Sequence, residues 1–430
     1  MNISPARIAA YEVLLRIETE RAFSSVLLPL FEKGLSAPDA ALCHELTLGT
    51  LRNQILIDRM LSFHIGEKKL DVEVRIALRL GTYQLVFLDR IPAYSAINDS
   101  VSLVQRAKKT SAKGLVNAVL RKMTSKLPEI EFSDEIDRIA TVNSHPRWLI
   151  EKWIKEFGII ETKSLAEANN TPSRLTFRLT GKASTRAWGA AEACSRSEYV
   201  EGCFFANGDS TELRQLSALG EIYFQDEGSQ MAAAAVRITN SERFLDVCAA
   251  PGSKTTMIGN RALDCDLLIA GDVYDQRIRF LRDNCIAQGL VDVKIVQYDA
   301  TKYLPFAEQS FGSVLVDTPC SGTGTIRRNP EIRYNLSDMD FEQFQTKQLQ
   351  MLKNASKMVK SGGTLVYSTC SLEREENEDV CSMFLSGDPG FSIDEPSVPE
   401  RFVNADGFAS TYPHRDNMDG FFIAGFRRMD

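Results

Sequence analysis

The sequence has few of the features that mark secreted, membrane-bound or metal-binding proteins. Its nine cysteines form no C-x-x-C pair and no regular spacing, which favours reduced thiols over a disulfide framework. Its four histidines are scattered along the chain, so we expect no metal site. No apolar run approaches the roughly 18 residues of a membrane span, and the first residues do not resemble a signal peptide. Together these absences predict a cytoplasmic protein, and we expect it to be a monomer.

An excess of basic charge is also missing, because the net charge is −7. A negative net charge disfavours a nucleic-acid partner, because domains that bind nucleic acids are usually basic. One stretch departs from it: the segment 105–126 has no acidic residue and contains Arg106, Lys108, Lys109, Lys113, Arg121, Lys122 and Lys126. Such a cluster can attract phosphate groups. On charge alone a solvated helix surface is the better explanation, so RNA binding needs independent support.

A chain of 430 residues is too long for one hydrophobic core, so two or three domains are expected. Residues 1–128 repeat apolar residues at helical spacing, with a break at Pro92, which predicts an all-α bundle. Residues 129–235 begin with an acidic linker and continue as a small α+β unit. Residues 236–430 alternate helices with strands, which we expect near 244–247, 266–271, 293–297, 313–316, 363–366 and 420–426. This alternation predicts a doubly wound α/β domain with a mainly parallel sheet.

The first expected strand of the α/β domain leads into a loop of small residues that opens a helix: Cys248, Ala249, Ala250, Pro251, Gly252, Ser253 and Lys254. Small residues and a helix N-terminus let a ligand approach the backbone. Lys254 and Thr255 imitate the end of a phosphate-binding P-loop, but the two glycines of that motif are replaced by Cys248 and Ser253. A dinucleotide-binding G-x-G-x-x-G is absent as well. The loop therefore predicts an adenosine-containing ligand without a phosphate requirement.

Four aspartates fall at the expected carboxyl ends of successive strands, namely Asp246, Asp272, Asp299 and Asp317. Ligands of open α/β sheets bind at that edge. Asp272 is placed to accept hydrogen bonds from both ribose hydroxyls, and Asp299 is placed to face the adenine edge. A single aspartate in such a position is often only an N-cap or turn residue, which stays the alternative for each of them.

Two cysteines also follow buried strands, Cys320 in Asp317-Thr318-Pro319-Cys320-Ser321-Gly322 and Cys370 in Ser368-Thr369-Cys370-Ser371. Two thiols at the ligand-binding edge suit a reaction in which one sulfur attacks C6 of a cytosine, C5 is methylated and another base finishes the reaction. The alternative for each thiol is a small buried hydrophobic group. Three arginines follow the first loop and are suited to phosphates beside the base: Arg327, Arg328 and Arg333.

These motifs resemble a known family. The loop 248–254, Asp272 with Arg277, Asp299, the loop 317–322 and the segment 368–371 resemble the RNA (cytosine-5) methyltransferases, which use S-adenosylmethionine. The segments 77–81, 91–98 and 116–121 resemble the RNA-binding domain of the antitermination factor NusB. In this order the chain resembles bacterial 16S ribosomal RNA (cytosine-5) methyltransferases of the RsmB or Sun type. One residue departs from the pattern, since Thr318 stands where that family usually has alanine.

The resemblance implies an all-α NusB-like bundle, a small α+β unit and an α/β Rossmann-like, S-adenosylmethionine-dependent methyltransferase domain. It implies that Cys370 attacks C6 of an unpaired or flipped-out cytosine, that Asp317 binds the N3/N4 edge, and that Cys320 helps remove the C5 proton. The cofactor would lie against residues 248–254, Asp272, Arg277, Asp299 and Asp317. The implied partner is small-subunit ribosomal RNA, with cytosine 967 of 16S ribosomal RNA as the target.

Three alternatives stay open at this point. Another ribosomal or transfer RNA cytosine would need the same active-site motifs. A DNA cytosine-5 methyltransferase would make Cys320 the nucleophile, but it would leave the Thr369-Cys370 element without a role. A non-catalytic antitermination or ribosome-assembly factor would use the first 128 residues alone. The combined presence of both cysteines and the strand-end aspartates favours methyl transfer over pure binding.

Overall fold

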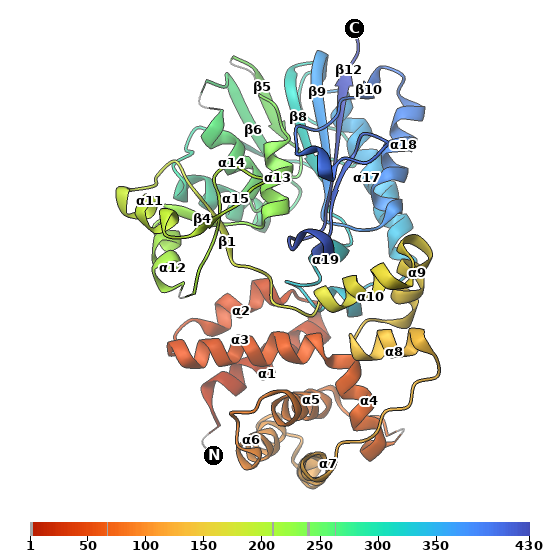
Figure 1. The fold of residues 1–430 in the computed structure, drawn as a ribbon. Helices are drawn as coiled ribbons and strands as arrows, with labels where there is room; N and C mark the ends of the chain where they lie inside the picture. The colour runs from red at the N-terminus through yellow and green to blue at the C-terminus, as the bar shows by residue number, and fades with distance from the viewer. Residues whose placement is uncertain (1–2, 67, 209, 239–240, 263) are drawn as a thin grey trace. The chain divides into compact units, whose positions relative to one another are not determined.

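The structure is a computed structural model that describes residues 3–66, 68–208, 210–238, 241–262 and 264–430. The chain divides into two compact units, each with its own core. One unit contains residues 1–171 and 326–338, and the other contains residues 172–325 and 339–430 (Figure 1). In the described ranges, no helix is long and apolar enough to cross a membrane, and no group of three or more His, Cys, Asp or Glu could hold a metal ion.

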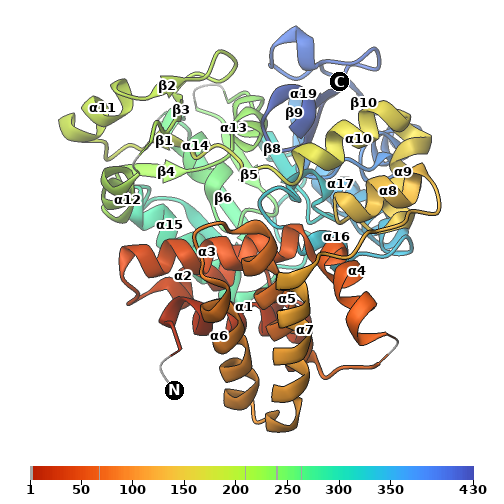
Figure 2. The same ribbon diagram turned by 60° about the horizontal axis from the view of Figure 1, so that its bottom comes forward.

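The first unit is helical, as the sequence predicts. Its N-terminal part consists of α1 (Pro5–Glu20), α2 (Ser24–Glu32), α3 (Ala37–Arg52), α4 (Gln54–Ile65), α5 (Val72–Phe87), α6 (Ala93–Arg106), η1 (Thr110–Ala112) and α7 (Lys113–Ser125). Pro92 is the N-cap of α6, where a proline interrupts no helical hydrogen bond. Helices α5, α6 and α7 pack side by side (Figure 2). Their apolar stripes contribute to the core formed with α1 and α3.

Three more helices complete this part of the chain, α8 (Glu135–Val142), α9 (Arg147–Phe157) and α10 (Ile159–Ala168). The same unit also takes up the segment 326–338, which includes the short helix α16 (Ile332–Asn335) and comes from the middle of the α/β sequence. Glu331 of this segment caps α2, because its carboxylate accepts hydrogen bonds from Ser24 N (2.6 Å) and Ser24 Oγ (3.0 Å). Part of the helical unit is therefore built from a distant stretch of sequence.

The second unit begins with the small α+β part: β1 (Thr176–Leu179), α11 (Thr185–Glu192), β2 (Ser195–Arg196), β3 (Cys203–Phe205), α12 (Thr211–Ala218) and β4 (Ile222–Phe224). Its strands pair in the order β2-β3-β1-β4, the arrangement of a split βαβ unit. Phe177 and Phe204 face α11 and α12 in one apolar cluster. Arg178 points to the opposite side of the sheet, where its guanidinium donates to Ser253 O (3.1 Å) and Thr256 Oγ1 (2.8 Å) of the following domain.

The rest of this unit is the α/β domain: α13 (Glu227–Ala234), β5 (Arg243–Asp246), α14 (Ser253–Arg261), β6 (Leu267–Asp272), α15 (Asp275–Ala287), β7 (Lys294–Gln297), β8 (Phe311–Asp317), η2 (Thr323–Thr325), α17 (Asp340–Ser356), β9 (Val359–Thr369), η3 (Arg374–Glu376), α18 (Glu378–Gly387), β10 (Phe391–Ile393), η4 (Glu400–Phe402), β11 (Ala409–Thr411), α19 (Pro413–Asp416) and β12 (Phe421–Arg428). The strand order is β10-β12-β9-β8-β5-β6-β7, with β11 beside β12.

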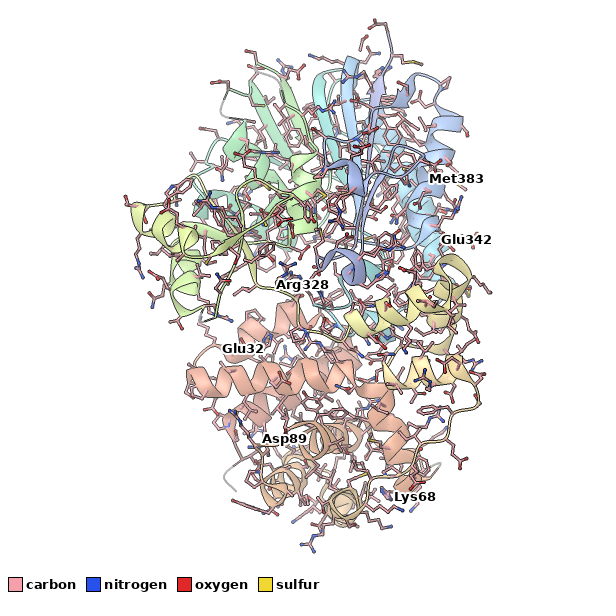
Figure 3. The ribbon with its side chains drawn as sticks, viewed as in Figure 1. Glu32, Lys68, Asp89, Arg328, Glu342 and Met383 are labelled. Atoms are coloured by element: carbon pink, nitrogen blue, oxygen red, sulfur yellow. The ribbon has the colours of Figure 1, made fainter. Side chains whose placement is uncertain are left out.

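Strands β7, β6, β5, β8 and β9 run parallel, and β12 is antiparallel to β9. Residues of α13 and α14 pack with Phe244, Leu315 and Val366 on one face of the sheet, and α17 and α18 pack on the other face. Figure 3 locates the outer helices by Glu342 on α17 and Met383 on α18. The predicted fold class is confirmed, and the expected main strands are present within a few residues. The domain boundaries at residues 128 and 235 stay predictions. They did not anticipate that residues 326–338 belong to the helical unit.

Candidate active site

The parallel strands place the predicted site residues at one edge of the sheet. Strands β5, β6 and β8 end at Asp246, Asp272 and Asp317, and β9 ends one residue before Cys370. Asp317 is paired in register with Ser368 of β9, so the two loops that carry the cysteines start side by side. Adjacent carboxyl ends of this kind form the ligand-binding edge of an open α/β sheet.

The two predicted catalytic cysteines are in contact, since Cys320 Sγ lies 3.2 Å from Cys370 Sγ. Both side chains are half-buried, and both thiols are free. The hydrogen bond with Cys370, followed by burial, holds the pKa of the Cys320 thiol well above its usual value. The two sulfurs lie within hydrogen-bond distance, and either thiol can be the donor.

Asp317 is bound on both carboxylate oxygens. Lys254 Nζ donates to Oδ2 at 2.7 Å, and Ser368 Oγ donates to Oδ1 at 2.7 Å. The Lys254 side chain is only 7% exposed and its ammonium group also lies over the ring of Phe421, so the lysine of this ion pair is shielded from water. The lysine that imitates a P-loop residue is therefore used to hold an aspartate beside the two thiols.

The predicted cofactor loop is fixed through its backbone. Gly252 adopts a φ of +105° directly before α14, a conformation that favours glycine. Ala250 N donates to Asp272 Oδ2 at 3.2 Å, Arg277 donates to Ala250 O at 2.7 Å, and Asn284 donates to Pro251 O at 2.7 Å. Arg277 thus contacts the loop, as well as lying 3.4 Å from the Asp272 carboxylate.

Asp246 and Asp299 have different surroundings from Asp272 and Asp317. Asp246 is buried, accepts a 2.6 Å hydrogen bond from Thr255 Oγ1, and has its pKa raised to about 7 by burial. Asp299 lies two residues beyond β7, and its Oδ1 accepts from the backbone and the hydroxyl of Thr301 at 3.0 and 2.6 Å. These are the contacts of a turn residue, and its expected place at the adenine edge stays a prediction.

The proposed phosphate contacts of Arg327 and Arg333 are wrong. Arg333 is fully buried, and its Nη1 donates to Asn143 O (3.0 Å), Ser144 O (3.2 Å) and Asn170 Oδ1 (3.0 Å). Arg327 is 1% exposed, and both arginines belong to the segment that packs in the helical unit. The guanidinium of Arg333 serves the interior of that unit, because carbonyl oxygens of neighbouring loops need buried donors. Arg328 is half-buried in the same segment (Figure 3).

Gly324 lies where the two cysteine loops meet. A side chain on Gly324 would lie 2.1 Å from Gly420 O, so the space beside Gly324 is filled by backbone. Gly324 N donates to Cys370 O at 2.9 Å, which ties the first cysteine loop to the second. The glycine at this position therefore allows the close approach of two backbone segments.

Two residues near the thiols were missed in the sequence. Glu376 is fully buried and bonds to the residues that follow both cysteines, Ser321 and Ser371. Asn377 bonds to residues on both sides of Cys370. Their signal in the sequence was weak, because they lie within a charged run, 373–379, that is typical of a solvated surface.

Comparisons with known proteins give the chain a family. Residues 4–125 match the NusB family, and residues 233–427 match the family described as 16S rRNA methyltransferase RsmB/F. A probable ribosomal RNA small subunit methyltransferase B of Bacillus subtilis (strain 168) is 32% identical over 447 residues, which cover 100% of both chains. The chain belongs to this family. A ribosomal RNA small subunit methyltransferase B of Salmonella enteritidis PT4 is 31% identical over 434 residues, 97% of each chain.

Solved structures agree with this family assignment. The crystal structure of PH0851 matches with a TM-score of 0.87 and 26% identity, and covers 100% of both chains. The crystal structure of NSun6 from Pyrococcus horikoshii with SFG matches with a TM-score of 0.58 and 20% identity, over 66% of this chain and 98% of that one. The second likeness shows the fold alone. The protein is thus a ribosomal RNA methyltransferase of the RsmB/F family, with a NusB domain at its N-terminus.

Proposed function

We propose that this methyltransferase transfers a methyl group from S-adenosylmethionine to C5 of a cytosine in 16S ribosomal RNA, with cytosine 967 as the target. The observation that supports this chemistry best is the 3.2 Å contact between Cys320 Sγ and Cys370 Sγ. Methylation at C5 needs a nucleophile for C6 and a base for the C5 proton. Two thiols this close together can reach the same cytosine and supply both. Asp317 beside them offers carboxylate oxygens to the polar edge of the same base.

Cys370 is the nucleophile in this proposal. The contact with Cys370 and burial raise the pKa of the Cys320 thiol and disfavour its thiolate, so the proposal gives the bond to C6 to the sulfur of Cys370. Forming that bond pushes electron density onto C5, which becomes the carbon that accepts the methyl group. The carboxylate of Asp317 accepts a hydrogen bond from the N4 amino group and so orients the base, while electron density from the sulfur spreads into the ring toward C5 and N3.

Cys320 becomes the base only after Cys370 has reacted. The first cause of its raised pKa is the hydrogen bond with Cys370, and that cause disappears once the Cys370 sulfur is bonded to carbon. Cys320 then loses its proton to water. Its thiolate takes the proton from C5, the electron pair of the C5–H bond forms the C5–C6 double bond, and the C6–S bond breaks to return Cys370 as a thiolate.

The residues at the sheet edge fit S-adenosylmethionine. Lys254 is paired with Asp317, so the loop 248–254 offers a ligand its backbone and small side chains, without a cation for phosphate. The two oxygens of Asp272 each accept one backbone N–H and keep a lone pair for a ribose hydroxyl. When bound, the cofactor supplies the methyl group as an electrophile. Asp272 and Asp299 would hold its adenosine part, and residues 248–254, Arg277 and Asp317 would line the rest of the site.

The basic run of the helical unit is the proposed contact for the RNA backbone. Lys109 pairs with Asp71 (2.9 Å), and Lys126 lies 3.8 Å from Glu129. Arg121 and Lys122 are exposed on α7. Cations at such a surface would attract phosphate groups in a salt-dependent manner. The target cytosine has to be unpaired or flipped out of its helix to reach both thiols.

A covalent trap tests the proposal. Cys320→Ala, Cys370→Ala and the control Cys194→Ala are each incubated with S-adenosylmethionine and unmodified small-subunit ribosomal RNA, then run on a denaturing gel. We expect RNA to stay attached to the Cys320→Ala protein alone, since its adduct with Cys370 cannot be released. The attached fragment then identifies the target cytosine, and a fragment without position 967 would move the reaction to another site.

Other outcomes contradict the proposal in different ways. RNA attached to Cys370→Ala alone would exchange the roles of the two thiols, as in the DNA-type scheme. A wild-type protein that transfers no methyl group, together with variants that trap no RNA, would favour a non-catalytic RNA-binding factor.

A further inference from the structure

The two cysteine loops share one buried carboxylate, that of Glu376. Its Oε1 accepts from Ser321 N at 2.9 Å, and its Oε2 accepts from Ser371 Oγ at 2.5 Å and from the hydroxyl of Ser321. Ser321 and Ser371 directly follow Cys320 and Cys370 in the chain. Glu376 is fully buried, and among the described residues its carboxylate accepts hydrogen bonds from Ser321, Ser371 and Gln348 rather than from either sulfur. It is therefore placed to act through the loops.

The residues that precede the two cysteines are held by the same group of side chains. Gln348 of α17 donates from Nε2 to Pro319 O at 3.1 Å and to Glu376 Oε1 at 2.9 Å. Asn377 accepts from Thr369 Oγ1 at 2.6 Å and donates from Nδ2 to Ser371 O at 2.9 Å. Each cysteine is thus flanked on both sides by residues that bond to Glu376, Asn377 or Gln348.

We propose that Glu376, assisted by Asn377 and Gln348, is the positioning residue that fixes the distance between the Cys320 and Cys370 sulfurs. A carboxylate accepts several hydrogen bonds at once, so one side chain can hold both loops. Charged acceptors form the stronger hydrogen bonds, and in a buried site they keep the bonded groups in one arrangement. The inference deepens the proposed function, on which it rests for the roles of the two thiols.

The carboxylate also adds a negative charge near the thiols. This charge is one of the smaller causes that raise the pKa of Cys320, after the hydrogen bond with Cys370 and burial. Position and charge can be separated by substitution. Glu376→Gln keeps the shape and can keep the bonds, because the serine hydroxyls can turn to accept from its amide. Glu376→Ala removes both the bonds and the charge.

A reagent that needs two neighbouring thiols measures the sulfur geometry directly. Phenylarsine oxide reacts with two thiols to form two As–S bonds, and its oxygen leaves as water with the two thiol protons. The reaction needs neither RNA nor S-adenosylmethionine. The rate of capture is followed by intact mass, and protection of Cys320 and Cys370 from alkylation identifies the site. Cys320→Ala shows how much arsenical the other thiols take up.

We expect Glu376→Ala to slow capture at this pair by about tenfold or more, because the two sulfurs are no longer held together. Glu376→Gln should capture within about threefold of wild type, since its hydrogen bonds can remain. The matched control is Glu342→Ala, which removes an exposed carboxylate from α17, the helix that carries Gln348 (Figure 3). It should capture at the wild-type rate.

Kinetics then separate positioning from general damage. Glu376→Ala should lose about 100-fold in kcat with the KM values for RNA and cofactor unchanged, as expected when reacting groups are misplaced by a fraction of a bond length or more. Glu376→Gln should move the limb of the pH–rate profile that belongs to Cys320 to lower pH, because the neighbouring negative charge is gone. If Glu376→Ala does not fold, the double variant Ser321→Ala/Ser371→Ala replaces it, with slower capture expected again.

Two results would overturn the inference. One is arsenical capture by folded Glu376→Ala, or by the double serine variant, at the wild-type rate. The other is an equal loss of capture in Glu376→Gln and Glu376→Ala, which would show that the hydrogen bonds are not what holds the pair. A wild-type protein that captures the arsenical as expected but transfers no methyl group would refute the proposed function alone, and the positioning role would stand.

Discussion

Lys254 Nζ donates to Asp317 Oδ2 at 2.7 Å, so a lysine of the cofactor loop is bound to an aspartate of the loop that carries Cys320. The pair joins the first strand–helix junction of the α/β domain to the end of β8. It places a positive charge next to the one carboxylate that is expected to bind the target base. The ion pair therefore connects the cofactor side of the site with the base side.

Lys254→Met should impair the reaction more than the binding of cofactor. Without the ammonium group, the hydrogen bond that Asp317 keeps from a described side chain is the one from Ser368, so its carboxylate is less firmly oriented. We expect kcat to fall by about 10- to 100-fold. The Kd of S-adenosylmethionine, measured by calorimetry, should change by less than about threefold. Lys294→Met, at an exposed position of β7, is the control. A large rise in Kd with normal kcat would show that Lys254 binds the cofactor.

Asp272→Asn should weaken cofactor binding. The carboxylate accepts from Ala250 N and Val273 N, and an amide would place a donor where one acceptor is needed. We expect the Kd of S-adenosylmethionine to rise by about 10- to 100-fold in calorimetry. Asp266→Asn, which changes an exposed aspartate at the other end of β6, should bind as wild type. Equal affinity of Asp272→Asn and wild type would remove Asp272 from the cofactor site.

Much of the site was predictable because it depends on local pattern. The strand-end aspartates, the loop of small residues and both cysteines each follow an apolar strand, and parallel strands bring such positions to one edge. Contact between Cys320 and Cys370 follows from the adjacency of β8 and β9, which the sequence does not specify. The partner of Lys254 depends on the same adjacency, so the sequence did not predict its ion pair with Asp317.

Other features depend on contacts that no local pattern contains. Helix α2 has no local start signal, because Phe23 at its N-cap offers no side-chain acceptor and Pro29 lies inside it. Its cap is Glu331, 307 residues away. Arg333 and Glu376 lie in charged stretches that predict exposed surfaces, yet both are fully buried. Charged residues in the interior need partners from several elements, and only the tertiary structure shows them.

Arg333→Met tests whether this arginine is structural. Its guanidinium donates hydrogen bonds to Asn143 O, Ser144 O and Asn170 Oδ1, and methionine has no donor to replace them. We expect a loss of about 2 to 4 kcal/mol in the stability of the helical unit, measured by urea unfolding. Arg121→Met, at an exposed position of α7, should change stability little. A phosphate-binding arginine would give the opposite result, with normal stability and a weaker, less salt-dependent affinity for RNA.

Asp246→Asn should alter how stability depends on pH. Burial, assisted by the charges of Asp317 and Asp272 and opposed by Thr255 and Lys254, raises the pKa of Asp246 to about 7. The folded state therefore binds a proton that the unfolded chain releases near pH 4. The stabilising effect of that proton is complete below about pH 4 and is lost as the pH rises through about 7. Over this range the group should contribute a loss of up to about 4 kcal/mol, which an uncharged asparagine avoids.

The comparison that isolates Asp246 is the stability of the variant minus that of wild type, measured by urea unfolding at pH 5 and at pH 8. Other buried carboxyls, such as Glu331, titrate in both proteins and cancel in this difference. Asparagine can keep the acceptor for Thr255 Oγ1, so the packing at the start of α14 is retained. The difference should shift in favour of the variant between pH 5 and pH 8. A constant difference would mean that Asp246 is already ionised at pH 5, with its charge compensated by Lys254 and Thr255.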